Sequence, residues 1–208
     1  MYIGDWSSDV CSSDLHAMPV GYDYQGEVRW HASLNFAFDL KRLANGHVLI
    51  GTERLVKTPY FTTGLYEMAM SGKIFKEYVI PCGGYHHDQF EMPDGNILAL
   101  TFDFYSGTVE DVCVLLDKDT GEILDKWDYK DVLPQYPVGG SGSQDAHDWF
   151  HNNAVWYDKR TNTLTFSGRH QDAVINIDYE HDENGKCKLN WIIGDPTGWP
   201  EDMQKYFF

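Results

Sequence analysis

The chain has 208 residues and a formal net charge of −16, from 32 acidic and 16 basic side chains. This excess of negative charge argues against nucleic acid and anionic membrane surfaces as partners, because both repel an acidic protein. No apolar run approaches the length of a membrane span. The 15% of aromatic residues is typical of a β-rich protein with stacked sheets.

The first fifteen residues differ from the rest of the chain. Residues 6–15 read WSSDVCSSDL, a tandem S-S-D without a packing pattern and without the apolar core of a signal peptide. We interpret residues 1–15 as a non-native leader that resembles translated sequencing-adapter sequence; a genuine disordered leader is the alternative. The domain is then expected to occupy residues 16–208. Its cysteines lack the C-x-x-C spacing of a zinc knuckle and allow at most one internal disulfide: Cys82, Cys113 and Cys187.

Two kinds of short repeat run along the chain. An Asn-Gly or Asp-Gly pair followed by a strand-like segment occurs at residues 44–51 and 93–101, with a looser copy from Thr161. A glycine that opens a second strand-like segment recurs at spacings of 46, 49 and 64 residues, at Gly26, Gly72, Gly121 and Gly185. A period in the forties with about four strands per unit predicts an all-β fold, a β-propeller with about four blades present.

The last spacing is longer because of an insertion at residues 129–148. Within it we predict a helical turn at residues 131–136 and the run GGSGSQ at residues 139–144, which is either a flap over the site or an inert surface insertion. A short helix is predicted at residues 200–208, which begin with Pro and acidic residues. Because a propeller has to close on itself, we expect the chain to be a piece of a longer protein.

Residues 145–178 organise the candidate chemistry. Their pattern predicts strands at residues 153–157, 163–167 and 173–177, with a polar turn at residues 158–162. A hairpin returns the chain to where it started, so His151 and Arg169 are expected near one end of adjacent strands. An imidazole beside a guanidinium, with Asn153 as a further donor, suits an oxyanion with several oxygens.

Two histidine clusters lie at equivalent places in successive repeats: YHHD at residues 85–88 and HDWFH at residues 147–151. The corresponding FAFD at residues 36–39 has no histidine. On the inner strands of neighbouring blades, the histidines would converge on the central channel. His87 and His151 are our first choices for the site, whereas His86, His147 and His170 are expected to orient neighbours or to cap strand ends. Taken singly, each histidine can also be a structural hydrogen-bonding group.

Other side chains near these clusters have predicted supporting roles. Asp88 and Asp148 are expected to fix an imidazole tautomer through the other ring nitrogen. Tyr85, Tyr105 and Trp149 either stack on an aromatic substrate or pack in the core. A metal site is a further alternative, because zinc or non-haem iron could use the donors of His86, His87, Asp88, His147 and His151. Arg169 would repel a divalent cation there, so we expect no metal.

Two motifs carry a family resemblance. The H-x-N of His151 and Asn153, followed after eighteen residues by S-G-R-H-Q around Arg169, resembles the bacterial arylsulfate sulfotransferase family. The run WIIGDPTGW at residues 191–199 is similar to that family's next blade. The resemblance implies a six-bladed propeller that transfers a sulfuryl group from an aryl sulfate to a phenol by a ping-pong route through a sulfohistidine. It implies no nucleotide donor, cofactor or metal, and a periplasmic or secreted location.

The same resemblance assigns residues. His151, Asn153 and Arg169 match the family's sulfuryl-binding motif, and His87, with His86 matching less closely, corresponds to its upstream active-site histidine. The nucleophilic histidine of the family lies in a later blade, beyond the last residue of this chain. Arg169, His151 and His87 are therefore the predicted catalytic residues, and the predicted substrate-binding residues are Asn153, His86, His147 and His170. The competing functions are a non-catalytic propeller that binds a ligand and a metal-dependent hydrolase.

Overall fold

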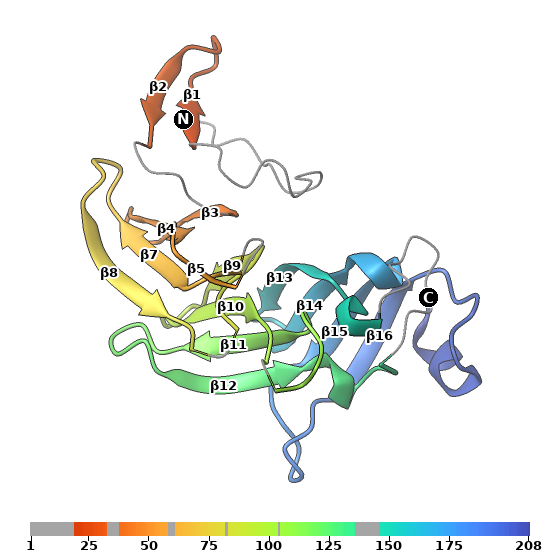
Figure 1. The fold of residues 1–208 in the computed structure, drawn as a ribbon. Coiled ribbons are helices and arrows are strands. Elements are labelled where there is room, and N and C mark those ends of the chain that lie inside the picture. The colour runs from red at the N-terminus through yellow and green to blue at the C-terminus, as the bar shows by residue number, and fades with distance from the viewer. Residues whose placement is uncertain (1–18, 33–37, 58–60, 82, 104, 136–145) are drawn as a thin grey trace. The chain divides into compact units, whose positions relative to one another are not determined.

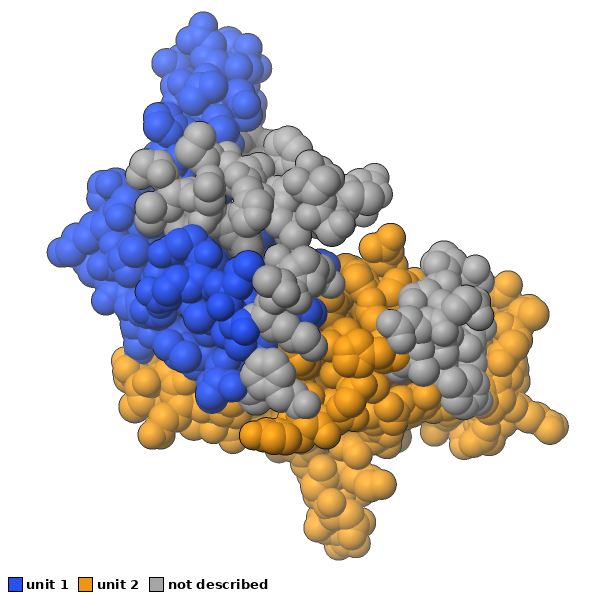
Figure 2. All heavy atoms as spheres, viewed as in Figure 1, with its two compact units in different colours: residues 1–87 blue, residues 88–208 orange. Residues whose placement is uncertain are grey.

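The computed structural model in Figure 1 describes residues 19–32, 38–57, 61–81, 83–103, 105–135 and 146–208. The predicted leader and the predicted flap at residues 139–144 lie outside these ranges. The chain divides into two compact units, residues 1–87 and 88–208 (Figure 2). No helix among the described residues is both long enough and apolar enough to cross a membrane.

The first unit is built from short antiparallel strands. The hairpin of β1 (Val20–Tyr22) and β2 (Val28–His31) is followed by a four-stranded sheet of β3 (Leu40–Arg42), β4 (Val48–Gly51), β7 (Gly64–Met68) and β8 (Ile74–Val79). A small two-stranded sheet, β5 (Leu55–Lys57) and β6 (Phe61–Thr62), lies between β4 and β7 in the sequence. The second strand, β4, is buried along its whole length, so this sheet has its apolar centre at Val48 and Ile50.

The second unit holds two four-stranded antiparallel sheets, each in simple chain order (Figure 1). One consists of β9 (Gln89–Glu91), β10 (Ile97–Thr101), β11 (Val112–Leu116) and β12 (Ile123–Asp128). The other consists of β13 (Asn152–Asp158), β14 (Thr163–Gly168), β15 (Ala173–Asp178) and β16 (Leu189–Gly194). The two sheets share one hydrophobic core, which includes Leu98, Trp127, Phe166 and Ile175.

Burial explains the sequence of these strands. The middle strands β10 and β11 are buried at every position, so they appear as the continuous apolar runs ILALT and VCVLL. The last strand β12 is mostly exposed and carries charged residues, which protects an open sheet edge from pairing with another chain. The residue before β9 is also hydrogen-bonded to the first strand of the other sheet, β13, since the Asp88 carboxylate accepts the backbone N–H of Val155 at 2.9 Å.

The predicted repeats correspond to hairpins of these sheets. Gly46 and Gly95 have φ angles of 88° and 89°, which is why the first hairpin of a sheet needs glycine there. The glycines of the second repeat each lead into the last strand of a sheet, β2, β8, β12 and β16: Gly26, Gly72, Gly121 and Gly185. The all-β prediction is confirmed. The described residues hold three four-stranded sheets, and the propeller closure and the blade number stay predictions.

The strand predictions in residues 145–178 are confirmed to within one residue at each end, whereas the helix predictions need correction. The predicted turn at residues 131–136 is wrong, because the 3-10 helix lies earlier, at η1 (Tyr129–Asp131), where the Asp128 carboxylate accepts the N–H of Lys130 at 3.0 Å. The C-terminal prediction is confirmed as η4 (Glu201–Tyr206). Two further 3-10 helices, η2 (Ala146–Asp148) and η3 (Arg169–Gln171), were not predicted.

Candidate functional site

One backbone conformation recurs at the start of three sheets. His87 and His151 have φ angles of 53° and 54°, and Phe38 has 68°, in the left-handed region that non-glycine residues rarely adopt. Such a conformation costs on the order of 1–3 kcal/mol and persists only where the surrounding structure enforces it. The two predicted histidines therefore occupy the same strained position in successive sheets.

The residue after each of these positions holds the conformation in place. An aspartate or asparagine oxygen accepts a backbone N–H at the start of the strand: Asp39 from Leu40 at 2.8 Å, Asp88 from Gln89 at 2.9 Å and Asn152 from Ala154 at 3.3 Å. The Asp88 carboxylate accepts the backbone N–H groups of Gln89 and Val155, both at 2.9 Å, so it anchors the starts of two strands. The expectation that Asp88 also fixes an imidazole tautomer stays a prediction.

The ring of His151 lies against two carboxylates. Its Nδ1 is 2.8 Å from Asp148 Oδ2 and 3.0 Å from Glu110 Oε2. His151 is buried, and Glu110 is 0% exposed. Burial by itself would lower the pKa of His151, but the hydrogen bond with Asp148 and the charges of Glu110 and Asp148 outweigh it, against the opposing charge of Arg169. The pKa of His151 is therefore raised, which favours the imidazolium.

Arg169 and His170 reach the same end of the sheet through η3. The backbone N–H of Arg169 donates to the carbonyl of His151 at 3.0 Å, and that of His170 donates to the carbonyl of Phe150 at 3.2 Å. The ring of His170 lies 4.5 Å from that of His151, centroid to centroid, and its Nδ1 is 2.6 Å from the carbonyl oxygen of Asp148. The expected proximity of His151 and Arg169 at adjacent strand ends is thus present in the structure.

Gly168 makes this approach possible. A Cβ at this position would lie 2.6 Å from Cε2 of Phe150, a distance that no real side chain tolerates. Because Gly168 has no side chain, the end of β14 packs directly on the Phe150 ring. The next residue, Arg169, begins η3. The glycine of the S-G-R-H-Q motif is therefore a packing requirement for placing Arg169.

Asn153 lies in a β-bulge of the first strand. Asn152 pairs with Gly168 and Ala154 with Ser167, so Asn153 has no partner of its own on β14. Bulges next to functional sites commonly redirect a side chain away from the regular alternation. Its neighbour Asn152 is buried and donates through its amide to the hydroxyl of Tyr129. Because the amide of Asn152 is used in this way, the half-buried Asn153 is the asparagine that we keep as a candidate ligand-binding group.

His147 fastens the loop that carries η2. Its ring Nδ1 is 2.6 Å from the carbonyl oxygen of Gly107, and its own carbonyl accepts the N–H of Val109 at 2.9 Å. These contacts agree with an orienting role and hold the segment before Asp148 against the loop before β11.

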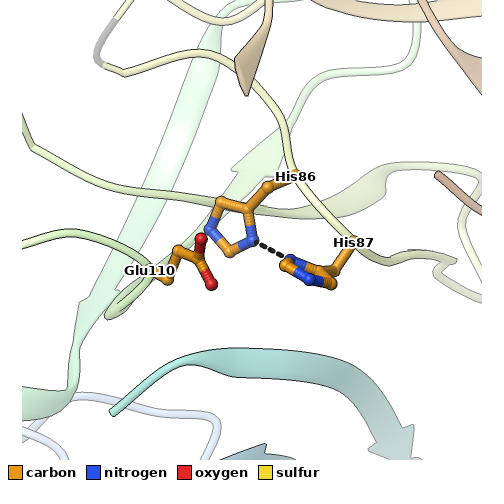
Figure 3. Close-up of side chains that lie close together, drawn as sticks. All are labelled: His86, His87 and Glu110. Carbon is orange, nitrogen blue, oxygen red and sulfur yellow. Dashed lines mark hydrogen bonds between the residues drawn. The ribbon is translucent and has the colours of Figure 1, made fainter. Parts of the chain in front are cut away.

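His86 and His87 belong to the first unit and contact each other, as the dashed line in Figure 3 shows. Their Nδ1 atoms are 3.1 Å apart, and an N···N hydrogen bond needs one donor and one acceptor, so the two rings are not both protonated at Nδ1. The ring of Phe38 lies 5.0 Å from that of His87. Because His151, Asn153 and Arg169 belong to the second unit, the convergence of His87 on them stays a prediction.

A buried charge network lies beside the site in sequence and in space. Asp111 accepts hydrogen bonds from Trp149 Nε1 and Lys130 Nζ, both at 2.8 Å, and from the hydroxyl of Thr108. These hydrogen bonds fix the indole of Trp149 two residues before His151. Trp149 and Tyr85 are fully buried and pack in the core, whereas Tyr105 is 97% exposed. Core packing, not substrate stacking, is therefore the role of Trp149 and Tyr85.

One set of donors in the second unit could reach a single cation. Asp148, His151 and His170 each bring a ligand atom to within 4.8 Å of the others. The Nδ1 atoms of both rings already lie at hydrogen-bond distance from oxygens of Asp148, and a cation would have to replace those hydrogen bonds. The larger donor set named as an alternative in the sequence analysis is not the same as this one, because it includes His147 and Asp88 and lacks His170.

Glu110 is the site residue that sequence reasoning missed. It precedes β11, has a φ angle of 56°, and is fully buried. Nothing in the histidine motifs points to it, because it lies forty-one residues before His151. The available signal was the acidic pair Glu110-Asp111 placed directly before a strand that is buried throughout.

Comparisons with known proteins bear on this site. The sequence matches the arylsulfotransferase (ASST) family over residues 8–208. It is 23% identical over 230 residues to the arylsulfate sulfotransferase AssT of Escherichia coli O6:H1 (strain CFT073), covering 87% of this chain and 37% of that protein. It is 22% identical to the protein of the same name from Lelliottia amnigena, with the same two shares. The chain thus spans 37% of the length of these curated relatives.

A solved structure is similar in fold. The crystal structure of a protein of unknown function from Bacteroides caccae aligns with a TM-score of 0.51 and 15% sequence identity, covering 85% of this chain and 59% of that one. At this identity the likeness concerns the fold alone. The family match, in contrast, includes both motif segments, the H-x-N strand start and the Arg169 turn that the structure brings together. On that basis the chain belongs to the arylsulfotransferase family.

Proposed function

We propose that this protein is an arylsulfate sulfotransferase, which moves a sulfuryl group from an aryl sulfate to a phenol without a nucleotide sulfate donor. The observation that carries the proposal is the pairing of two cations at one sheet end in a chain of this family. His151 is held toward its imidazolium form by the buried Glu110 and the half-buried Asp148, and the backbone N–H of Arg169 is hydrogen-bonded to the His151 carbonyl at 3.0 Å.

The chemistry needs cations at such a place. Sulfuryl transfer, like phosphoryl transfer, has a loose transition state with negative charge on three equatorial oxygens, which positioned donors stabilise. Arg169 would hold two of these oxygens with its planar fork. His151 would donate from Nε2, the ring nitrogen away from the carboxylates, and Asn153 would add an amide donor. His87 and His86 would complete the site, and His147 and His170 would orient it.

The route that we propose is ping-pong, through a sulfohistidine. The nucleophilic histidine would come from a further blade, as the family resemblance implies, so none of the histidines described above takes that role. The four-stranded sheets would be blades of a six-bladed β-propeller. Aryl sulfates and phenols would be the small-molecule substrates, and the periplasm or the exterior would be the location.

The proposal is tested by assaying the complete protein with a chromogenic aryl sulfate and a phenol acceptor. We expect release of the chromogenic phenol that depends on the acceptor, needs no nucleotide and persists in a chelator. A sulfated histidine should be detectable by mass spectrometry after incubation with donor alone. Absence of release at any donor concentration would contradict the proposal and favour a non-catalytic binding propeller.

A metal-dependent hydrolase is the second candidate, since Asp148, His151 and His170 bring donor atoms together. That function predicts release that does not need the acceptor and stops with the chelator. The positive charge of Arg169 disfavours it, because the same charge that lowers the pKa of His151 also opposes a divalent cation.

A further inference from the structure

We propose that Glu110 is a positioning residue for the sulfuryl site: its carboxylate lies 3.0 Å from the His151 Nδ1 that is hydrogen-bonded to Asp148, and its charge helps to hold the ring so that Nε2 is presented to the substrate. This inference rests on the proposed function for the identity of the substrate. The geometry that carries it is independent of that function. Figure 3 labels Glu110, which comes from the loop before β11.

The backbone of Glu110 is tied to the histidine strand. Its carbonyl oxygen accepts the N–H of Asn152 at 3.0 Å, so Glu110 and the residue after His151 are bonded directly. The left-handed conformation of Glu110, with φ 56°, matches that of His151, with φ 54°. The hydrogen bond thus joins Glu110 to the residue that follows His151, and the Glu110 carboxylate lies 3.0 Å from the His151 ring.

A carboxylate is seldom left in such a place without a function. Glu110 is 0% exposed, and an ionised carboxylate out of water costs several kcal/mol unless it is paired. The imidazole of His151 lies within ion-pair distance of Glu110, and the same nitrogen is hydrogen-bonded to Asp148 Oδ2 at 2.8 Å. Because an ionised carboxylate only accepts, this hydrogen bond requires a proton on Nδ1 and decides the tautomer of the ring, and Glu110 places a second negative charge beside that N–H.

Two groups from η3 also lie near His151. The ring of His170, in η3, lies 4.5 Å from the ring of His151. The Nδ1 of His170 is 2.6 Å from the backbone carbonyl oxygen of Asp148, and because a carbonyl only accepts hydrogen bonds, this Nδ1 carries a proton. Also from η3, Arg169 acts on His151 as a positive charge. The two carboxylates offset this charge, so that a cationic His151 can lie beside a guanidinium. Without Glu110, one carboxylate would face both cations.

The test measures the His151 ring directly, in the chain as it stands. We would label histidine with ¹³C and ¹⁵N, assign His151 by the resonance lost in His151→Gln, and titrate wild type, Glu110→Gln and Glu110→Asp by NMR. Glu110→Gln should lower the pKa of His151 and weaken the signature of protonated Nδ1. The shorter charged side chain of Glu110→Asp should give a smaller change. The matched control is Asp125→Asn, which removes the carboxylate 2.9 Å from His181 Nε2 and should leave His151 unchanged.

An unchanged His151 titration in both Glu110 variants would overturn the inference. If Glu110→Gln does not fold, Glu110→Asp carries the test alone, with the same two outcomes. In the complete protein, Glu110→Gln should reduce turnover about 10- to 100-fold, the usual effect of losing a group that orients a site residue. It should also move the alkaline limb of the pH profile to lower pH, because a His151 of lower pKa loses its proton earlier.

The positioning role of Glu110 and the proposed function can be contradicted separately. A shifted titration of His151 with unaltered turnover would mean that Glu110 positions the ring while His151 plays no part in catalysis, which contradicts the proposed function alone. An unshifted titration with lost turnover would contradict the positioning role and leave the function standing.

Discussion

His87 and His151 occupy the same position in successive sheets and differ in what surrounds them. Both have a left-handed backbone, and both precede a residue whose side chain accepts an N–H at the strand start. The Nδ1 of His87 lies 3.1 Å from a second imidazole, that of His86. The Nδ1 of His151 lies between two carboxylates, Asp148 and Glu110.

The difference shows how a repeat fold separates geometry from chemistry. The repeat sets the backbone, since Phe38 adopts the same conformation in the sheet before without any polar ring atom. The charge state is set by loops outside the repeat: η2 supplies Asp148, and the loop before β11 supplies Glu110. A His86–His87 pair joined through Nδ1 atoms and a His151 whose pKa is raised by carboxylates can therefore coexist on equivalent backbones.

The strongest test of this comparison is to replace His87 and His151, each in its own variant, by phenylalanine, the residue at the equivalent position 38. His151→Phe should lower the free energy of unfolding by about 3–5 kcal/mol, because it leaves the buried Glu110 carboxylate without its imidazole partner. His87→Phe should cost only about 0.5–1.5 kcal/mol, for the hydrogen bond with His86. Urea unfolding of this chain measures both. Equal losses would mean that the carboxylates do not distinguish the two histidines.

Arg169→Lys tests the second cation in the complete protein. Lysine keeps the charge but lacks the planar fork, and loss of one such transition-state donor typically lowers turnover about 10²–10³-fold. His151→Ala should be at least as damaging. The control is Arg160→Lys, at an exposed arginine that pairs with Asp158 in the β13–β14 turn. Near-normal turnover of Arg169→Lys would show that the planar fork is not required and would contradict the role proposed for Arg169.

Gly168→Ala tests how the turn that carries Arg169 is held. The new Cβ would lie 2.6 Å from the Phe150 ring, and overpacking of this kind costs about 1–3 kcal/mol. The unfolding midpoint in urea should fall accordingly, whereas Ser167→Ala, one residue earlier on β14, should leave it nearly unchanged. If both variants are equally stable, Phe150 can move, and the motif glycine is not required for packing.

The smallest expected effect is on the pH dependence of stability. The pKa of His151 is raised in the folded chain, chiefly by the Asp148 hydrogen bond and the Glu110 charge working against burial. The stability that this shift contributes is fully present below the unfolded value of about 6.5 and is lost as pH rises through the folded pKa. Unfolding free energies of wild type and His151→Gln, measured from about pH 6 to pH 9, should therefore converge with rising pH. A constant difference would contradict a raised pKa.

Much of this architecture could be predicted from residues close together in the sequence. The strands around His151 were placed to within one residue, because alternating apolar positions and the polar turn before Thr163 are local signals. The approach of Arg169 to His151 was also predictable from local sequence, because the hairpin of β13 and β14 returns the chain to the end of β13 where it began. The helical turn η1 was misplaced because Asp128 caps it from outside the predicted segment.

The sequence by itself determined the strand order, the repeat and the H-x-N and S-G-R-H-Q motifs, since hairpins join neighbours in the chain and turn residues mark their ends. Only the tertiary structure decided the charge of the site. Glu110 reaches His151 from forty-one residues away, and Asp111 anchors Trp149 across a similar separation. Such contacts depend on how two sheets pack and on the burial that removes water from a carboxylate, and neither leaves a periodic trace in the sequence.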